Sequence, residues 1–164
     1  MVFNMFKKNK KSGTTLYAPL TGKVVSIEDV PDPVFNQQMM GEGIAVEPVE
    51  GKVYAPCDGE IMQVAPTKHA IGILTATGEE ILIHVGLDTV NLKGEGFTAN
   101  VETGDTISKG DLLLSFDLEA IREKVPSTIT PMVITNAAQL EKNYTFTTET
   151  EAKQGETVLV EITD

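Results

Sequence analysis

The sequence predicts an all-β protein, an antiparallel β-sandwich or barrel with one or two short helices. Three observations support this fold class. Short runs of β-branched and aliphatic residues recur along the chain, turn signals separate them, and 14 glycines and 8 prolines interrupt the chain too often for long helices. Short strands at such even spacing are typical of sandwiches and barrels.

The expected strands follow one another at short intervals. Each is rich in residues of high β propensity, and glycine-containing turn signals lie between them. The predicted strands are residues 23–27, 43–46, 61–64, 71–75, 80–85, 111–116 and 157–162.

Two short helices are expected between the strands. Residues 118–125 contain an E-A-I-R-E-K stretch, and Pro126 ends it because proline cannot continue a helix. Residues 34–40, which follow Asp32-Pro33, form the second candidate.

The chain also contains an internal repeat. Residues 17–24 (YAPLTGKV) match residues 54–61 (YAPCDGEI) in the pattern YAP-x-x-G-x-[VI]. In each copy proline fixes one bend and glycine permits another, so an extended entry turns directly into a strand. Two copies indicate a duplication and not a solenoid.

Length and composition bound the class of protein. The 164 residues suit one domain, which we place at residues 16–164 after an N-terminal arm of residues 1–15. A net charge of −11 argues against nucleic acid as a partner. Cys57 is the only cysteine, so a reducing compartment is expected. No apolar run approaches a membrane span, so we expect an acidic cytoplasmic domain.

The arm has a composition of its own. It combines four apolar residues with a lysine cluster: Val2, Phe3, Met5 and Phe6, then Lys7, Lys8, Lys10 and Lys11. We expect a flexible tail, because chain ends usually fray. Any contact with an anionic membrane surface should be weak, since each lysine near such a surface contributes only about 1 kcal/mol.

The two histidines, His69 and His84, are the most informative residues of the chain. Residues 76–79 between them read as a hairpin turn. With a two-residue loop at Thr77-Gly78, His69 faces Gly86 across the hairpin. An odd-length loop would instead place the two histidines on opposite faces of the sheet.

In this register both histidines share one sheet face with Thr67, Leu82 and Gly86, because strand side chains alternate. The two rings become diagonal neighbours, about 7–8 Å apart at the backbone. His84 interrupts an apolar run, so desolvation should keep its imidazole neutral. A neutral imidazole is a nucleophile toward phosphorus or a metal ligand, and a buried structural role is the third interpretation.

Other site classes lack their motifs. The sequence has no G-x-x-x-x-G-K-[ST], no complete dinucleotide fingerprint, no H-E-x-x-H and no G-x-S-x-G. A zinc site at His69 and His84 would therefore need a carboxylate, or a side chain from a partner, to complete it.

Five segments carry a resemblance to a known family. They are DPVF…MMGEGIAV (32–46), PTKHAIGI (66–73), ILIHVGLDTVNLKGEGF (81–97), GDTISKGD (104–111) and STITPMVITN (127–136). In this order they resemble the glucose-family enzyme IIA of the bacterial phosphoenolpyruvate:sugar phosphotransferase system. The resemblance implies a flattened antiparallel sandwich of the barrel-sandwich hybrid type, with residues 16–164 as one EIIA type 1 domain.

The resemblance also implies a function. A phosphocarrier of this family accepts a phosphoryl group from phospho-HPr and donates it to a cysteine of a transporter's IIB domain, which makes it a phosphotransferase. No cofactor is required, although zinc at His69 and His84 is conceivable in a complex. Further partners would be permeases or sugar and glycerol kinases, bound according to phosphorylation state. The alternative is a zinc-binding hydrolase or a non-catalytic regulatory module of the same fold.

Site residues follow from the matching positions. His84 corresponds to the phosphorylated histidine, which attacks through Nε2, and His69 to the histidine that stabilises the phosphoryl oxygens. Thr67 corresponds to the hydroxyl that orients His69, and the Gly86 carbonyl would hold the Nδ1 proton of His84.

The same comparison implies a docking face. Asp32 and Asp88 correspond to acidic rim positions that meet arginines of HPr. The apolar docking ring corresponds to Phe35, Met39, Met40, Leu82 and Val90. The sugar is chosen by the transporter, so this chain does not specify it.

Overall fold

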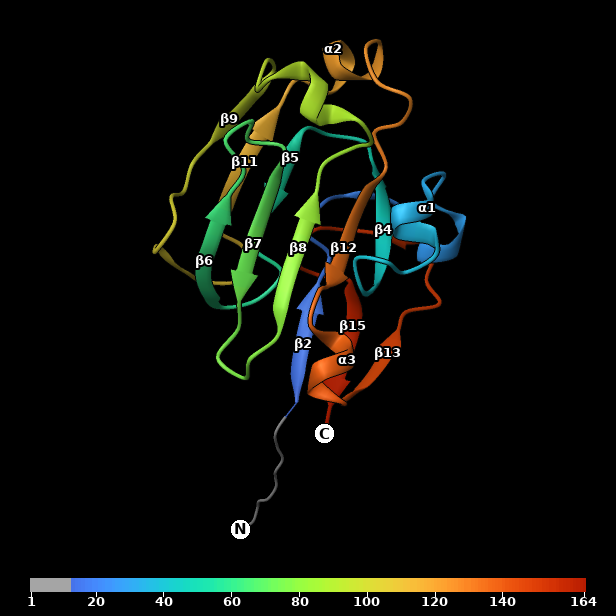
Figure 1. Cartoon of the computed structure of the whole chain (residues 1–164), viewed down its shortest axis with the longest axis vertical. Coiled ribbons are helices and arrows are strands. Elements are labelled where there is room, and N and C mark those ends of the chain that lie inside the picture. The colour runs from blue at the N-terminus through green and yellow to red at the C-terminus, as the bar shows by residue number, and fades with distance from the viewer. Residues whose placement is uncertain (1–12) are drawn as a thin grey trace.

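The computed structural model describes residues 13–164, which form antiparallel sheets with a few short helical segments (Figure 1). The strands are β2 (Thr14–Tyr17), β3 (Gly22–Ser26), β4 (Glu42–Pro48), β5 (Lys52–Tyr54), β6 (Gly59–Val64), β7 (Ala70–Leu74), β8 (Glu80–His84), β9 (Phe97–Ala99), β10 (Thr106–Ile107), β11 (Leu112–Phe116), β12 (Thr130–Ile134), β13 (Asn143–Phe146), β14 (Glu151–Ala152) and β15 (Val158–Thr163). The helical segments are η1 (Ile27–Asp29), α1 (Pro33–Asn36), η2 (Thr89–Leu92), α2 (Leu118–Arg122) and α3 (Ala137–Leu140).

Three sheets build the sandwich. The eight-stranded sheet has the order β10-β6-β7-β8-β12-β4-β3-β14, and the three-stranded sheets have the orders β5-β11-β9 and β13-β15-β2. The predicted all-β fold class is confirmed, and each of the seven predicted strands and both predicted helices is present within a few residues. None of the described helices has the length and apolar character needed to cross a bilayer.

The boundary of the predicted arm differs from the structure. The predicted arm extends to residue 15, but Thr14 and Thr15 belong to β2, where they pair with Ile162 and Glu161 of β15. The remainder of the arm, residues 1–12, lies outside the described residues.

The internal repeat has a matching set of hydrogen bonds. Tyr17 N donates to Pro56 O at 2.9 Å, and Tyr54 N donates to Pro19 O at 2.8 Å, so each copy binds the other at equivalent positions. The alanine after each tyrosine accepts from a glycine of a later turn, at 2.9 Å from Gly110 in one copy and at 3.0 Å in the other. The duplication in the sequence is therefore a duplication in structure.

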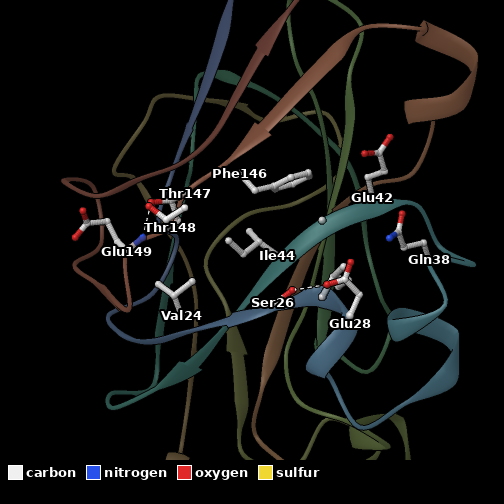
Figure 2. Close-up of a pocket in the computed structure, with 12 residues that line it drawn as sticks. Val24, Ser26, Glu28, Gln38, Glu42, Ile44, Phe146, Thr147, Thr148 and Glu149 are labelled. Carbon is white, nitrogen blue, oxygen red and sulfur yellow. Dashed lines mark hydrogen bonds between the residues drawn. The ribbon is translucent and has the colours of Figure 1, made fainter.

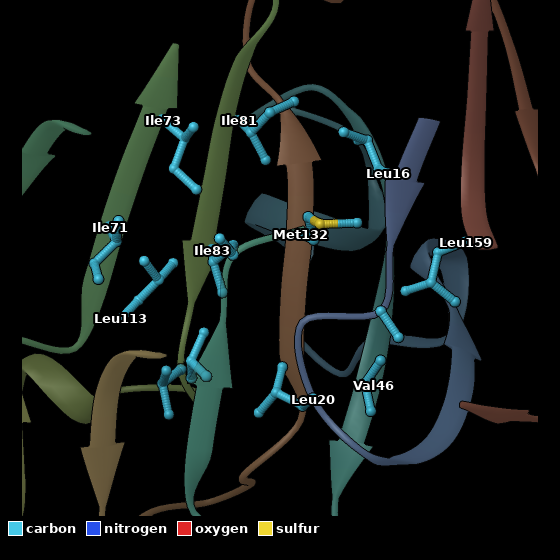
Figure 3. Packing of buried hydrophobic residues seen from close by; sticks show 14 of the residues in the cluster. Leu16, Leu20, Val46, Ile71, Ile73, Ile81, Ile83, Leu113, Met132 and Leu159 are labelled. Carbon is cyan, nitrogen blue, oxygen red and sulfur yellow. The ribbon is translucent and has the colours of Figure 1, made fainter. Parts of the chain in front are cut away.

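The hydrophobic core lies between the large sheet and the two small ones. Alternate residues of neighbouring strands, such as Ile71 and Ile73 on β7 and Ile81 and Ile83 on β8, point into it (Figure 3). The residues between them, including Leu82, face the outer side of the large sheet. Because each fully buried aliphatic side chain contributes about 1.5–3 kcal/mol, this alternation fixes which face of the hairpin is the core.

Strand β12 is the main element that sequence reasoning missed. All five residues of β12 are buried, because the core covers one face and the segment containing α1 covers the other. Pro131 argues against a central strand, since it cannot donate to a ladder. In the structure β12 pairs with β8 only from Met132, opposite Ile83, so Pro131 lies where the ladder has already ended.

A buried carboxylate, Glu79, fastens the loop between β7 and β8. Its side chain is fully buried and forms an ion pair with Lys142 Nζ at 2.7 Å, while Thr75 and Thr77 donate their hydroxyls to Oε1. Burial alone would raise the pKa of Glu79, but these donors and the Lys142 charge outweigh it and lower the pKa below its usual value.

The substitution Glu79→Gln should lower the free energy of unfolding at pH 7 by roughly 2–3 kcal/mol. This loss is smaller than the loss expected for a fully buried ion pair, because Lys142 retains some access to water. A carboxyl group with a lowered pKa stabilises the folded protein, and this contribution is lost as the pH falls through that pKa. The difference in unfolding free energy between wild type and the variant should therefore narrow below about pH 4. Urea unfolding at pH 7 and pH 3.5 measures both effects.

The matched control is Glu156→Gln, which removes an exposed ion pair with Lys153 at 3.3 Å. It should change the stability by less than about 0.5 kcal/mol. Equal losses in the two variants would contradict a special role for Glu79.

Candidate active site

The hairpin that carries the histidines has a different register from the predicted one. A two-residue loop at Thr77-Gly78 puts Ile71 opposite His84, but in the structure Ala70 pairs with His84, so the predicted two-residue loop is wrong. Thr75 N donates to Glu79 O at 3.0 Å, which leaves a loop of three residues that ends at Gly78 with φ of 101°. Three-residue hairpin loops commonly end with a left-handed residue, a position that suits glycine.

The two histidines nevertheless meet, for a reason that strand alternation does not supply. His69 precedes β7 and lies in a turn where Lys68 has φ of 61°, so its side chain is not bound to the alternation of the strand. Its carbonyl accepts from Val85 N at 2.7 Å, which ties the turn to the end of β8. The ring centroids of His69 and His84 are 4.9 Å apart with an interplanar angle of 78°. The predicted proximity is confirmed, although the predicted pairing is not.

His84 is the last residue of β8, half-buried on the outer face of the large sheet. Its Nδ1 lies 2.8 Å from the Gly86 carbonyl oxygen. A carbonyl can only accept, so Nδ1 carries the proton and donates, and the lone pair of the neutral ring is on Nε2. Gly86 has φ of 71°, and a Cβ there would lie 2.8 Å from Thr89 Cγ2, so the turn that presents this carbonyl requires glycine.

Pro131 is a second contributor to the position of His84. Thr135 N donates to Glu80 O at 2.9 Å. Every second residue of a strand donates toward the same neighbouring strand, so the residue at position 131 would be the one to donate to His84. Proline has no N–H, so the hydrogen-bond ladder between β8 and β12 ends before His84. The signal for this residue was in the sequence, as a proline within the apolar stretch TPMVI.

His69 is buried and has its own orienting partner. The Thr67 hydroxyl oxygen lies 2.5 Å from His69 Nδ1, as the family resemblance implied. With both Nδ1 atoms engaged, by Thr67 and by Gly86, the atom left free on each ring is Nε2.

Both histidines are neutral at pH 7. Burial, and to a smaller extent the neighbouring His84, lower the pKa of His69 to about 4, because two adjacent imidazoles resist being charged together. Burial also lowers the pKa of His84, although the Gly86 carbonyl and the carboxylates of Asp32 and Asp88 oppose this shift. Two neutral rings side by side suit nucleophilic chemistry better than ion pairing.

Phe35 packs against His84. It is 4% exposed, and its ring centroid lies 5.3 Å from that of His84 at an angle of 59°. Asp32 begins α1 by accepting from Val34 N at 2.9 Å through Oδ1. Phe35, expected in an exposed docking ring, is therefore a buried support for the His84 ring.

The other expected docking residues lie near the surface. Met39, Met40 and Val90 are 69%, 36% and 52% exposed, Asp88 is exposed, and Leu82 and Asp32 are half-buried. Four of the seven large apolar residues that the described chain exposes lie on the segments that flank His84: Val34 in α1, Met39 and Met40 just after α1, and Val90 in η2 after β8. Exposed apolar residues gathered near a site are typical of a protein-binding surface.

A cavity of the described structure lies apart from the two histidines. A cavity of about 480 Å³ lies between β3, β4 and the segment after β13, lined by Val24, Ile44, Phe146 and the acidic Glu28, Glu42 and Glu149 (Figure 2). Neither histidine lines it. Among residues 13–164, no group of three or more histidine, cysteine, aspartate or glutamate side chains is placed to hold a metal. His69 and His84 thus supply two ring nitrogens, fewer than a closed zinc site needs.

A neutral histidine with a fixed tautomer, half-buried beside a second imidazole, has the geometry of a nucleophilic group-transfer site. The comparisons with known proteins give the family. Residues 14–140 match the model of the phosphoenolpyruvate-dependent sugar phosphotransferase system EIIA 1 family, and the chain belongs to that family.

Curated relatives and a solved structure agree with this assignment. A glucose-specific EIIA component from Halalkalibacterium halodurans is 54% identical over 166 residues, which cover 98% of this chain and 95% of the relative. A glucosamine-specific EIICBA component from Bacillus subtilis is 55% identical over 128 residues, covering 78% of this chain and 20% of the relative. The glucose permease IIA structure from Mycoplasma capricolum matches with a TM-score of 0.85 and 35% identity, covering 96% of this chain and 99% of that one.

The substitution His69→Gln should flatten the pH dependence of stability. A buried histidine with a lowered pKa binds its proton more readily when unfolded, so wild-type stability is fully present above pH 6.5 and falls as the pH drops toward 4. The contribution of His69 to this fall is about 3 kcal/mol over the whole range. Urea unfolding between pH 7 and pH 4.5 measures it, and curves of identical slope for wild type and variant would contradict the lowered pKa.

Proposed function

We propose that this protein is a phosphocarrier whose His84 Nε2 accepts a phosphoryl group from phospho-HPr and passes it to a cysteine of a sugar transporter's IIB domain. One observation carries the proposal: the Gly86 carbonyl holds the Nδ1 proton of a neutral His84 at 2.8 Å, so Nε2 is a nucleophile without any further proton transfer. Membership in the EIIA family supports the role.

The transfer balances in two steps. In the first, the Nε2 lone pair of His84 attacks phosphorus, an N–P bond forms, and the N–P bond of phospho-HPr breaks with its electron pair returning to the HPr imidazole. In the second, a cysteine thiolate attacks the same phosphorus, and the His84 N–P bond breaks with its pair returning to Nε2. Catalysis of this kind depends mainly on in-line positioning and charge stabilisation.

In this mechanism His69 stabilises the transferring group. If the Thr67 hydroxyl donates to His69 Nδ1, the ring proton is on Nε2 and can bond to a phosphoryl oxygen. The pKa of about 4 keeps this ring neutral at pH 7, so it donates one hydrogen bond without carrying a full charge that would bind the phosphoryl group too tightly.

Partners and location follow from the same role. The exposed apolar patch with Asp32 and Asp88 suits brief docking of HPr and of IIB, because complementary charge speeds encounter and a small interface releases quickly. A relative named as a fused EIICBA component supports IIB as the acceptor. Relatives named for glucose and for glucosamine share this domain, so sugar specificity would reside in the transporter. We place the relay in the cytoplasm.

Regulation would follow from the charge of the phosphoryl group on His84. A phosphoryl group adds roughly −1.5 to −2 charges to the face, so permeases or sugar and glycerol kinases would bind the unphosphorylated form. Zinc shared with a partner's carboxylate is the alternative use of the pair, and it would draw on the same two Nε2 atoms.

The substitution His84→Ala should abolish phosphorylation. In a mixture of labelled phosphoenolpyruvate, enzyme I, HPr and this protein, wild type should acquire an acid-labile, base-stable label that the variant lacks. A label retained by the variant would reject His84 as the acceptor, and metal-dependent peptide cleavage by untreated wild type would favour the zinc hydrolase.

The substitution His69→Gln should separate acceptance from delivery. The variant should still acquire the label, because the His84 nucleophile is unchanged, but should pass it to IIB at least about 100-fold more slowly, as for other lost oxyanion donors. Rapid-quench measurement of both half-reactions tests this, and normal delivery by the variant would remove His69 from the mechanism.

A further inference from the structure

One glycine within a strand has no structural reason to be glycine. The described strands contain four glycines, and at three of them a Cβ would clash with a carbonyl oxygen of the neighbouring strand; these are Gly22, Gly43 and Gly59. At Gly72 the nearest atom to a Cβ would be Met62 Cβ at 3.8 Å, an ordinary contact, and φ is not positive. Glycine inside a strand lowers stability, so the fold gains nothing from Gly72.

Gly72 lies on the outer face of the large sheet, close to the active histidine. It pairs with Gln63 of β6 on one side and with Leu82 of β8 on the other, and the next outward pair along the hairpin is Ala70 and His84. Its neighbours Ile71 and Ile73 point into the core (Figure 3). One strand spacing and two residues separate Gly72 from His84, a backbone distance of roughly 8 Å.

The missing side chain leaves a hollow of about 150 Å³. Met62 and Leu82 supply apolar walls, and Gln63, Glu80 and Thr135 supply polar ones. Cavities on this scale hold a group the size of a benzene ring. Met62 is 40% exposed, and its unbranched thioether can adapt to an incoming group.

We propose that the hollow at Gly72 receives an apolar side chain of HPr and so aligns the phosphoryl donor with His84. The inference rests on the proposed function and deepens it by naming what a partner must carry: an apolar side chain about 8 Å from its reactive histidine. Two features of the face favour this donor. Leu82, which lines the hollow, lies on the same outer face of β8 as His84, two residues away, and the Glu80 carboxylate in the lining gives the hollow an acidic edge for a cationic partner.

The test fills the hollow with Gly72→Leu and, more gently, with Gly72→Ala. The KM for phospho-HPr should rise about 10-fold or more with leucine and about 2–5-fold with alanine, while kcat stays within twofold. The melting temperature of Gly72→Ala should instead rise by roughly 1–3 °C, because alanine replaces a strand glycine without a clash. Docking and stability thus change in opposite directions, which a purely structural role for Gly72 does not produce.

Two controls make the result specific. Thr145→Leu adds similar apolar bulk at an exposed strand position of the β13-β15-β2 sheet and should leave the KM for phospho-HPr unchanged. Phosphoramidate, a donor too small to need docking, reports on His84 alone in each variant. A parallel fall in the phosphoramidate rate would show damage at His84 and overturn the proposal.

The remaining outcomes separate this inference from the proposed function. An unchanged KM for phospho-HPr in Gly72→Leu, with normal transfer by wild type, would overturn the inference alone. A raised KM for the IIB acceptor only would assign the hollow to the acceptor and overturn the proposal as stated. Failure of wild type to accept any phosphoryl group from phospho-HPr would overturn the proposed function and this inference together.

Discussion

One hydrogen bond, from His84 Nδ1–H to the Gly86 carbonyl at 2.8 Å, is the interaction on which the candidate site depends. It fixes the tautomer, and the tautomer decides whether Nε2 can act as a nucleophile. The bond exists because the chain turns sharply after β8, with Gly86 at φ of 71°. The turn itself is held by Thr89, which donates to the Val85 carbonyl at 2.6 Å, and by Leu87, whose N–H donates to Ser127 O at 2.9 Å.

The surroundings of this bond combine rigidity with access. Phe35 packs against the His84 ring from the segment that covers the outer sheet face, and His69 approaches it edge-on. Pro131 ends the β8–β12 ladder beside His84, so the reactive side chain stands where β8 remains paired with β7 alone. The buried supports lie below a surface of exposed methionines and valines, which can fit unlike partners because thioethers adapt in shape. A carrier that serves a donor and an acceptor in turn requires this combination.

The neutral state of both histidines follows mainly from burial. For His84 the nearby carboxylates and carbonyls oppose the shift but do not cancel the desolvation that lowers its pKa. For His69 burial and the neighbouring ring act in the same direction, so its pKa falls to about 4. The fold thus stabilises the reactive protonation state at neutral pH through packing, and it loses part of its own stability when acid forces protons onto the pair.

The sequence by itself determined the fold class, seven of the strands, the outward face of β8 and the repeat, and it singled out His69 and His84, because period-two patterns, turn residues and long motifs are local signals. It did not determine the faces of β7, since the predicted register puts Ile71 opposite His84 and the structure turns Ile71 into the core. Nor did it determine the loop between β7 and β8 or the approach of His69 to His84. The loop has three residues, and Glu79, which follows it, forms an ion pair with Lys142, 63 positions away in the sequence. His69 is positioned by a left-handed turn that is hydrogen-bonded to the end of another strand. The burial of Phe35 and the central place of β12 were likewise decided by layers that close over them from distant parts of the chain. Contacts between residues far apart in sequence have no local signature, so only the tertiary structure decided these features.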